Sequence, residues 1–499
     1  MSEQSSKMWS GRFREPLNKR FEEWQRSFPF DYRLIETEIS ASNAHARMIQ
    51  AAGILTPEEG DRMVAGLNSI SLLGVSKATL NDPNAPFAAS AQQAEDIHHF
   101  VELELTRAIG DLALKLHTGR SRNEQIATDM RLYVSDAIEL LCAGMRRWCL
   151  SLIQIAESAG ENVMPSYTHL QRAEPVLVAH WLLCYVSMIE RDMSRLRDCQ
   201  ARLSFSPLGS GAIAGATLAL DRDIAAKVLY FQGPTLNSMD ATSDRDFAIE
   251  FTQALSLFGL HVSRFAEELT LFSTAEFGFL ELPEAFSTGS SAMPQKKNPD
   301  LTELLRAKSA SLIGSATALT VLLKGLPLAY NKDLQEGQIH VFEATETALG
   351  IFDVIWSFTD ALKFNFPRMR AAATTGYLNA MAAATYLSNK GVAFRKAHEI
   401  VGNAVRLGLE SGRELNALTL AELRTLSPEF GEDFFAAITL EATLDCHDVI
   451  GGTNRQRVAV ALEDARRRIA VLSGADSAKD VDGAAAPDPL RALKSAKLE

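Results

Sequence analysis

The sequence predicts an all-α protein of three domains, in which a long central helical bundle also joins copies of the chain. The first observation is a seam of apolar residues from Phe247 to Phe272, spaced three or four apart, which is the seven-residue period of packed helices. Four further long helical patterns accompany that seam along the chain. The first 117 residues show no sustained alternation of polar and apolar residues, so we expect no sheet there.

A chain of 499 residues is too long for one small core. We therefore divide it into four regions by their patterns. These are an N-terminal helical domain (1–117), a central long-helix bundle (118–366), a C-terminal helical domain (367–472) and a flexible tail (473–499).

The N-terminal region mixes short helices with turns. Polar and aromatic loops are expected at Trp9–Phe13 and Ser27–Leu34, and a helix at about 36–52 should stop at Gly53. Thr56 followed by Pro57 and two glutamates is a clear helix start. The run AQQAEDIHHFVELELTRAI predicts one further helix over 91–109.

The central region should form five long helices. Ser243 and Asp246 have the spacing of a capping box at the start of the seam helix. Several of the helices carry apolar residues on more than one face, so the excess face should be buried against other subunits. A monomeric solenoid is the alternative, but no fixed repeat supports it. The helices are expected at 123–159, 174–203, 243–272, 299–324 and 338–363.

The C-terminal region has shorter helices, with a turn at Ser427–Phe430. After Leu472 the residues are small, charged or proline, with few bulky apolar side chains, which is typical of a flexible tail.

Composition narrows the class of protein. The net charge of -12 argues against non-specific binding of nucleic acid. The five cysteines contain no CxxC pair, so we expect reduced thiols and neither a disulfide framework nor a zinc site. The N-terminus has no apolar signal-peptide core, and no apolar run reaches membrane-spanning length. A cytoplasmic enzyme is the simplest interpretation.

The stretch FSTGSSAMPQKKNPD, residues 286–300, is the centre of the functional interpretation. Its glycine and two prolines predict a loop, and Asn298 and Pro299 suit the N-cap and first position of the next helix. Backbone amides and lysines beside a helix N-terminus would hold an anion. On composition alone, an ordinary surface loop is an equal alternative.

Three other polar stretches interrupt the helical patterns. HTGRSRNEQ (117–125) resembles a helix cap, and SYTHLQRAEP (166–175) and LPLAYNKDLQE (326–336) are loops between helices. A lone histidine such as His169 is more often structural than catalytic, but its position in a loop favours function. In EDIHH, Glu95 with His98 or His99 has a spacing that zinc could use.

These strings together resemble one enzyme family. GSSxMPxKxNP is similar to the signature of the fumarase/aspartase superfamily, and GSSAMPQKKNPD, HTGRSRN and THLQRAEP resemble argininosuccinate lyases in particular. The resemblance runs from Trp9 to about Gly452. It implies β-elimination of a carbon–nitrogen bond that splits argininosuccinate into arginine and fumarate, in a homotetramer whose sites form where three subunits meet. It also implies that no cofactor and no metal take part.

The resemblance also implies roles for individual residues. Ser290 would be the base and His169 would transfer a proton at the leaving nitrogen, although the two could be exchanged. Lys296 would stabilise negative charge, and Glu303 could pair with His169. The implied substrate contacts are Ser27, Asn123, Thr168, Tyr330, Gln335 and Asn298, with His98, Asp96, Ser121 and Arg122 as secondary candidates.

The chain departs from the family pattern at four places. Glu174 stands where glutamine is usual, Gln25 where asparagine is common, and FVELEL follows EDIHH in place of Asn-Glu-Arg. Gln338 replaces a lysine, so one cationic contact is missing or supplied elsewhere. Two alternatives remain: another fumarate-releasing lyase such as adenylosuccinate lyase or aspartase, and a non-enzymatic relative like the lens crystallins.

Overall fold

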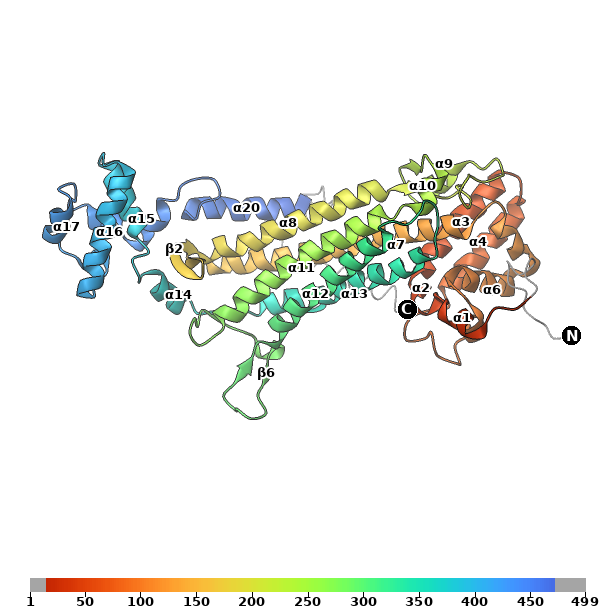
Figure 1. Ribbon diagram of the computed structural model, residues 1–499, viewed down its shortest axis with the longest axis horizontal. Coiled ribbons are helices and arrows are strands. Elements are labelled where there is room, and N and C mark those ends of the chain that lie inside the picture. The colour runs from red at the N-terminus through yellow and green to blue at the C-terminus, as the bar shows by residue number, and fades with distance from the viewer. Residues whose placement is uncertain (1–14, 472–499) are drawn as a thin grey trace.

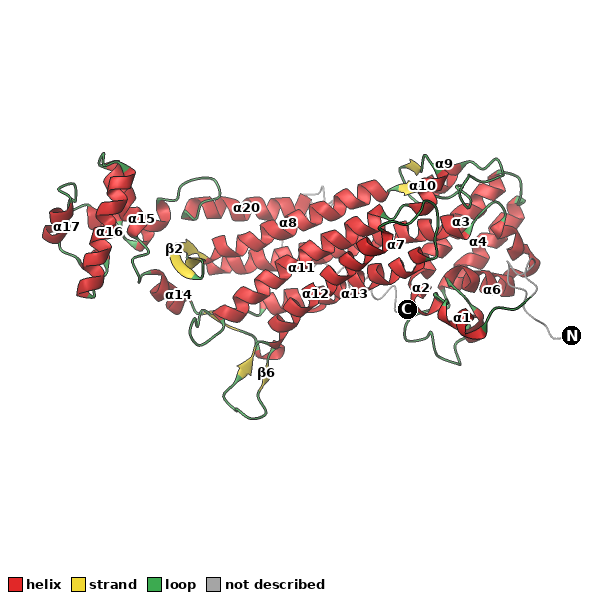
Figure 2. Cartoon of the chain, in the orientation of Figure 1, coloured by secondary structure: helices red, strands yellow, loops and turns green. Residues whose placement is uncertain are grey.

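The computed structural model describes residues 15–471 and is a long, mainly helical molecule. Figures 1 and 2 show a central bundle with one group of helices at each end. The expected loop at Trp9–Phe13 and the expected tail at 473–499 lie outside the described residues. No helix in the described part is both long and apolar enough to cross a bilayer.

The N-terminal region is built from short helices packed around α3. The predicted helix start at Thr56 is confirmed, and Thr56 and Glu59 form a capping box for α4. The single helix expected over 91–109 is wrong: the chain is extended at Ala94, and Asp96 caps a new helix by accepting a hydrogen bond from the backbone N–H of His99 (2.8 Å). A capping side chain here competes with helix continuation. The helices are α1 (Lys19–Trp24), α2 (Phe28–Asp31), α3 (Ile35–Ala51), α4 (Pro57–Ser71), α5 (Ala88–Gln93) and α6 (Ile97–Ile109), with 3-10 turns at Tyr32–Leu34 and Gly110–His117.

Five long helices form the bundle, which confirms the all-α prediction. The seam residues of α11 are all buried, and Trp148 of α7 packs edge-on against Phe258 and Phe265 while its Nε1 donates to Thr359 Oγ1 (3.0 Å). The indole N–H of Trp148 is therefore satisfied inside the bundle core. The long helices are α7 (Arg122–Ala159), α8 (Val178–Leu203), α11 (Asp246–Phe272), α12 (Asp300–Leu323) and α13 (Asp333–Asp360).

The starts of four long helices differ from expectation, and α13 begins at Asp333, five residues before the expected start. Ser243 ends the short helix α10 (Ser238–Ser243), and Arg245 occupies the N-cap of α11 without a side-chain cap, so the predicted capping box is wrong. Pro299, and not Asn298, holds the N-cap of α12. The helix expected from residue 174 begins at Val178, because residues 171–177 pair as a strand.

Strands are short and form only two-stranded ribbons in the described part. The longest is the antiparallel hairpin of β1 (Val163–Thr168) and β2 (Gln171–Leu177), at the far end of α7. The others are β3 (Phe205–Ser206) with β4 (Gly233–Pro234), β5 (Leu280–Glu281) with β8 (Lys363–Phe364), and β6 (Thr288–Gly289) with β7 (Lys297–Asn298).

The C-terminal helices have a small core of their own around Phe430 and Phe434, beside the confirmed turn at Ser427–Phe430. The last helix, α20, returns to pack on α7 and α8. The division at residues 117 and 366 stays a prediction. The remaining helices are α9 (Arg222–Val228), α14 (Phe366–Ala373), α15 (Ala380–Asn389), α16 (Phe394–Ser411), α17 (Leu420–Leu426), α18 (Phe434–Ala437), α19 (Leu440–Asp445) and α20 (Arg455–Val471).

Candidate active site

The loop between β6 and β7 surrounds the Ser290 hydroxyl with donors. Ser290 Oγ accepts hydrogen bonds from the backbone N–H groups of Ala292 (3.2 Å) and Met293 (3.1 Å). Two amide donors stabilise negative charge on that oxygen more than they stabilise the neutral hydroxyl. The arrangement can therefore make a serine hydroxyl a stronger acid and its alkoxide a usable base.

The end of the same loop holds Lys296 and Asn298 together. Lys296 Nζ donates to Asn298 Oδ1 (2.5 Å), and the amide of Asn298 lies 3.4 Å from both Thr288 Oγ1 and the carbonyl of Gly289. Asn298 lies in β7, so its side chain ties the two strands together and does not cap α12 as expected. Glu303 is exposed on the first turn of α12.

Thr168 and His169 lie at the tip of the β1–β2 hairpin. Thr168 pairs with Gln171, and the two residues between them, His169 and Leu170, have φ of 54° and 57°. A two-residue turn with both φ values positive follows the right-handed twist of its strands, but costs side-chain-bearing residues some strain. Both Thr168 and His169 are exposed, so the hairpin presents them outward from the end of the bundle.

The start of α7 carries a second group of predicted residues. Ser121 caps the helix in a capping box with Glu124, so its side chain has the structural role that its sequence context suggested. Arg122 Nη1 donates to Asp96 Oδ2 (2.9 Å). The amide of Asn123 reaches the carbonyl oxygen of Ala212 (3.2 Å) and is half-buried.

Ser27, Tyr330 and Gln335 lie at this same end of the molecule. Gln335 Nε2 donates to the backbone carbonyl of Gln25 (3.0 Å), which joins the start of α13 to the loop before α2. Ser27 is buried and its hydroxyl bonds to Asp31. Burial raises the pKa of the Tyr330 phenol to about 12, so Tyr330 is a hydrogen-bond donor at neutral pH.

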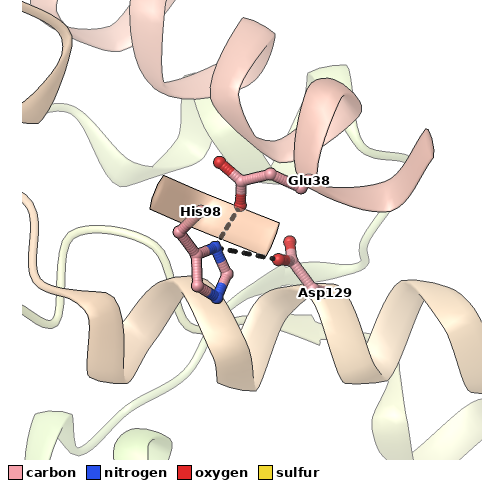
Figure 3. A group of neighbouring side chains, drawn as sticks. All are labelled: Glu38, His98 and Asp129. Carbon is pink, nitrogen blue, oxygen red and sulfur yellow. Dashed lines mark hydrogen bonds and ion pairs between the residues drawn. The ribbon is translucent and has the colours of Figure 1, made fainter. Parts of the chain in front are cut away.

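His98 is buried behind these residues, against two carboxylates (Figure 3). Its Nδ1 lies 2.8 Å from Glu38 Oε2 and 3.6 Å from Asp129 Oδ2. Burial opposes charge on the imidazole, but the Glu38 carboxylate outweighs it and raises the pKa of His98. Burial and the neighbouring Glu38 charge raise the pKa of Asp129 well above its ordinary value.

A cavity of about 270 Å³ opens beside this group. His117, Arg120 and Arg122 contribute to its wall, and burial lowers the pKa of His117 to about 4, so Arg120 and Arg122 supply positive charge there and His117 does not. It adjoins the residues predicted to contact substrate at the start of α7.

The predicted residues thus form three separate groups within one chain. α7 has 38 residues, so about 57 Å separate Asn123 at its start from the hairpin of His169 beyond its end. α12 has 24 residues, so about 36 Å separate Asn298 from the Tyr330 end. Figure 1 likewise places β2 and β6 toward one end of the bundle and the N-terminal helices at the other.

Two residues that the sequence did not single out lie in the group at the start of α7. Asp31 is buried with Oδ1 unpartnered, and Arg245 is buried with Nη2 unpartnered. Arg245 lines a small cavity together with Gln338, the residue that replaces the family lysine. Asp31 lies one helical turn after Ser27, and this spacing from a predicted substrate contact was the sequence feature that could have identified it.

The buried carboxyl group of Asp31 should make the free energy of unfolding depend on pH. Burial raises its pKa from 3.8 to about 7, so the folded state holds a proton that the unfolded state releases between those values. Stability is therefore lost as pH rises through this window, by up to about 4 kcal/mol. Asp31→Asn should gain in Tm relative to the unmodified chain between pH 4.5 and about 7.5. Scanning fluorimetry of both proteins checks this, and a Tm difference that does not change with pH contradicts it.

Two family models match this sequence. Residues 11–314 match a family model described as lyase, and residues 377–445 match one described as argininosuccinate lyase C-terminal. The argininosuccinate lyase of Acidobacterium capsulatum is 60% identical over 94% of this chain and 96% of its own length. That of Koribacter versatilis is 52% identical over 93% of this chain and 98% of its own.

Solved structures share the fold at lower identity. An EDDS lyase in complex with formate aligns with a TM-score of 0.75 and 24% identity, covering 93% of this chain and 89% of that one. A fumarate lyase from Mesorhizobium sp. BNC1 aligns with a TM-score of 0.66 and 20% identity, covering 92% and 100%. The predicted relationship is confirmed: the chain belongs to the argininosuccinate lyase family.

Proposed function

We propose that the chain cleaves L-argininosuccinate into L-arginine and fumarate by β-elimination, the last step of arginine biosynthesis, without a cofactor. The observation that carries the chemistry is the Ser290 hydroxyl with its two amide donors, in a loop that also holds Lys296 and Asn298. The family relationship supports the substrate. We also propose a cytoplasmic location.

The elimination needs a base, groups that stabilise the negative charge of the intermediate, and an acid. The Ser290 alkoxide takes the proton from the carbon next to the one that bears nitrogen and becomes a hydroxyl, which leaves a doubly charged aci-carboxylate. Lys296, Asn298 and the start of α12 stabilise that charge. The carbon–nitrogen bond then breaks, the double bond of fumarate forms, and His169 gives a proton to the leaving guanidino nitrogen. Glu303 would pair with His169, and the roles of Ser290 and His169 could be exchanged.

The substrate would be held mainly by the residues at the start of α7 and α13. These hydroxyls, amides and one guanidinium suit carboxylates and a guanidino group. The Ser121 side chain caps α7 and His98 is buried against Glu38, so we assign these two to positioning the others. The proposed contacts are Ser27, Asn123, Arg122, Thr168, Tyr330, Gln335 and Asn298.

A complete site requires more than one subunit, because the hairpin and the Ser290 loop each lie tens of ångströms from the start of α7 and α13 in one chain. We propose a homotetramer in which different copies contribute the loop, the hairpin and the start of α7. The exposed apolar residues Leu260 on α11 and Leu304 and Val321 on α12 support this, since large apolar side chains on the bundle surface suit burial against another subunit.

An absorbance assay tests the function directly. Purified protein should release fumarate from argininosuccinate and should leave adenylosuccinate and aspartate unchanged. Fumarate from either of those two substrates would assign the chain to that activity instead. No fumarate from any of the three would support the non-enzymatic alternative.

A further inference from the structure

The β1–β2 hairpin carries His169 at an exposed tip. Thr168, His169 and Leu170 are all exposed, and the last two have positive φ. Residues in such a strained turn keep their conformation only where the surrounding structure fixes it. The position of His169 therefore depends on the contacts that hold the two strands below the tip.

Hydrogen bonds fasten both ends of β2 to the C-terminal part of the chain, beside α14 and the start of α20 (Figure 1). Arg172 Nη1 donates to the carbonyl of Ala372 (3.2 Å) and to Thr375 Oγ1 (3.1 Å). The backbone N–H of Leu177 donates to Thr453 Oγ1 (2.9 Å), two residues before α20. An arginine and a backbone amide keep their charge state at all ordinary pH values, so these contacts do not change with pH.

A third contact, between the other two, joins two groups that can change charge. Glu174 Oε1 lies 3.4 Å from His447 Nε2, and that oxygen is buried without a hydrogen-bond partner. A buried carboxylate oxygen is costly unless it is paired. A protonated His447 gives it an opposite charge, whereas a neutral imidazole is a weaker partner.

Glu174 is tied to both strands of the hairpin. Ser166 Oγ donates to the carbonyl of Glu174 (2.7 Å) and accepts a hydrogen bond from its backbone N–H (3.2 Å). This link stands where the register of the two strands shifts, between Pro165 and Tyr167. A contact that holds the Glu174 side chain therefore holds β1 as well as β2.

The groups around the pair leave His447 as the cation that faces Glu174. From α8, His180 faces the pair, and burial together with the nearby His447 lowers the pKa of His180. At the end of α19, burial and then the Glu174 carboxylate raise the pKa of the Cys446 thiol, which keeps it neutral. Other charged groups next to His447 in the sequence pair with α20: Asp445 with Arg455, and Asp448 with Arg457.

We propose that Glu174 and His447 are positioning residues for the proton transfer at His169, a role that rests on the proposed function. A protonated His447 holds β2 against the segment before α20, and this fixes the tip of the hairpin for the site that uses it. Loss of that proton loosens the hairpin, so turnover falls while substrate binding at the start of α7 persists. Glu174 is also a place where the chain departs from the family pattern, in which glutamine is usual.

Variants of His447 test the role of its charge, at pH 6 where histidines are commonly protonated. His447→Gln should lower kcat by about fivefold, the effect of one half-buried ion pair, and leave KM within about twofold. His447→Lys, which keeps a cation, should restore kcat. Asp448→Asn is the matched control and should change neither constant, because it breaks only the exposed pair with Arg457 (2.6 Å). An unchanged kcat in His447→Gln, or no rescue in His447→Lys, overturns the proposal.

The pH profile gives a second readout that a merely structural role would not move. The kcat of His447→Lys divided by that of the unmodified protein should rise from about 1 at pH 6 to about 5 at pH 8.5, because the imidazole loses its charge and lysine does not. The ratio cancels the pH dependence of the chemistry, which both proteins share. A ratio that stays constant contradicts the proposal.

Hydrogen exchange in the whole protein gives a readout that does not need catalysis. At pH 6 the backbone amides of residues 166–172 should exchange about fivefold faster in His447→Gln than in the unmodified protein, and at the unmodified rate in Asp448→Asn. Unchanged exchange in His447→Gln would show that the pair does not hold the hairpin. A chain that shows the faster exchange but releases no fumarate would keep this role of the pair and lose the proposed function.

Discussion

Replacement of Ser290 by alanine is expected to lower kcat for argininosuccinate cleavage by about 10³-fold, with a much smaller change in KM. The proposed base is lost, whereas the residues at the start of α7 still bind the substrate. The backbone N–H groups of Ala292 and Met293 donate hydrogen bonds to Ser290 Oγ in the unmodified protein and would donate to water in the variant. Steady-state assays of fumarate release measure both constants.

Ser291→Ala is the matched control for this prediction. It removes a hydroxyl of the same size from the next residue of the same exposed loop. It should retain activity to within about tenfold, since no chemistry is assigned to that hydroxyl. If Ser290→Ala keeps its kcat, or if both variants lose activity equally, the assignment of the base is wrong.

The sequence predicted the bundle well because helix period and core packing have the same cause. The residues spaced three or four apart from Phe247 to Phe272 are those that α11 buries. Helix ends were less predictable, because a capping side chain can bond to residues that are distant in the sequence. Asn298 bonds across β6 and β7 instead of capping α12, and Asp96 starts a new helix inside an expected one.

The site residues that motifs could not reveal are those defined by packing across the chain. Glu38 and Asp129 are acids on buried helix faces, far apart in sequence, and only the crossing of α3, α6 and α7 makes them neighbours of His98. Asp31 and Arg245 likewise gain their unpartnered buried atoms from the fold. The hairpin that carries His169 was expected as a loop, because a His-Leu turn lacks the Asn-Gly signal of a tight hairpin.

Mixing two inactive variants, Ser290→Ala and His169→Asn, is expected to restore activity. If each site takes Ser290 from one subunit and His169 from another, random exchange at equal amounts gives about a quarter of the sites both native groups. Activity should therefore rise from near zero to about a quarter of that of the unmodified protein. Fumarate release before and after exchange measures this, with exchange verified by mass-tagged subunits.

A second mixture tests whether recovered activity comes from sites shared between subunits or from subunit exchange itself. Ser290→Ala mixed with the double variant Ser290→Ala/His169→Asn contains no Ser290 at all, so it should stay inactive under the same conditions. If both groups of a site came from one chain, every chain in the first mixture would lack one of them and no activity could return. The length of α12 separates the Ser290 loop from Tyr330 of the same chain by about 36 Å, so a site that took Ser290 and His169 from one chain would still need Tyr330 from another. Absence of recovery after verified exchange would show that the site lies within one chain, and the loop would then have to move toward the hairpin of its own subunit.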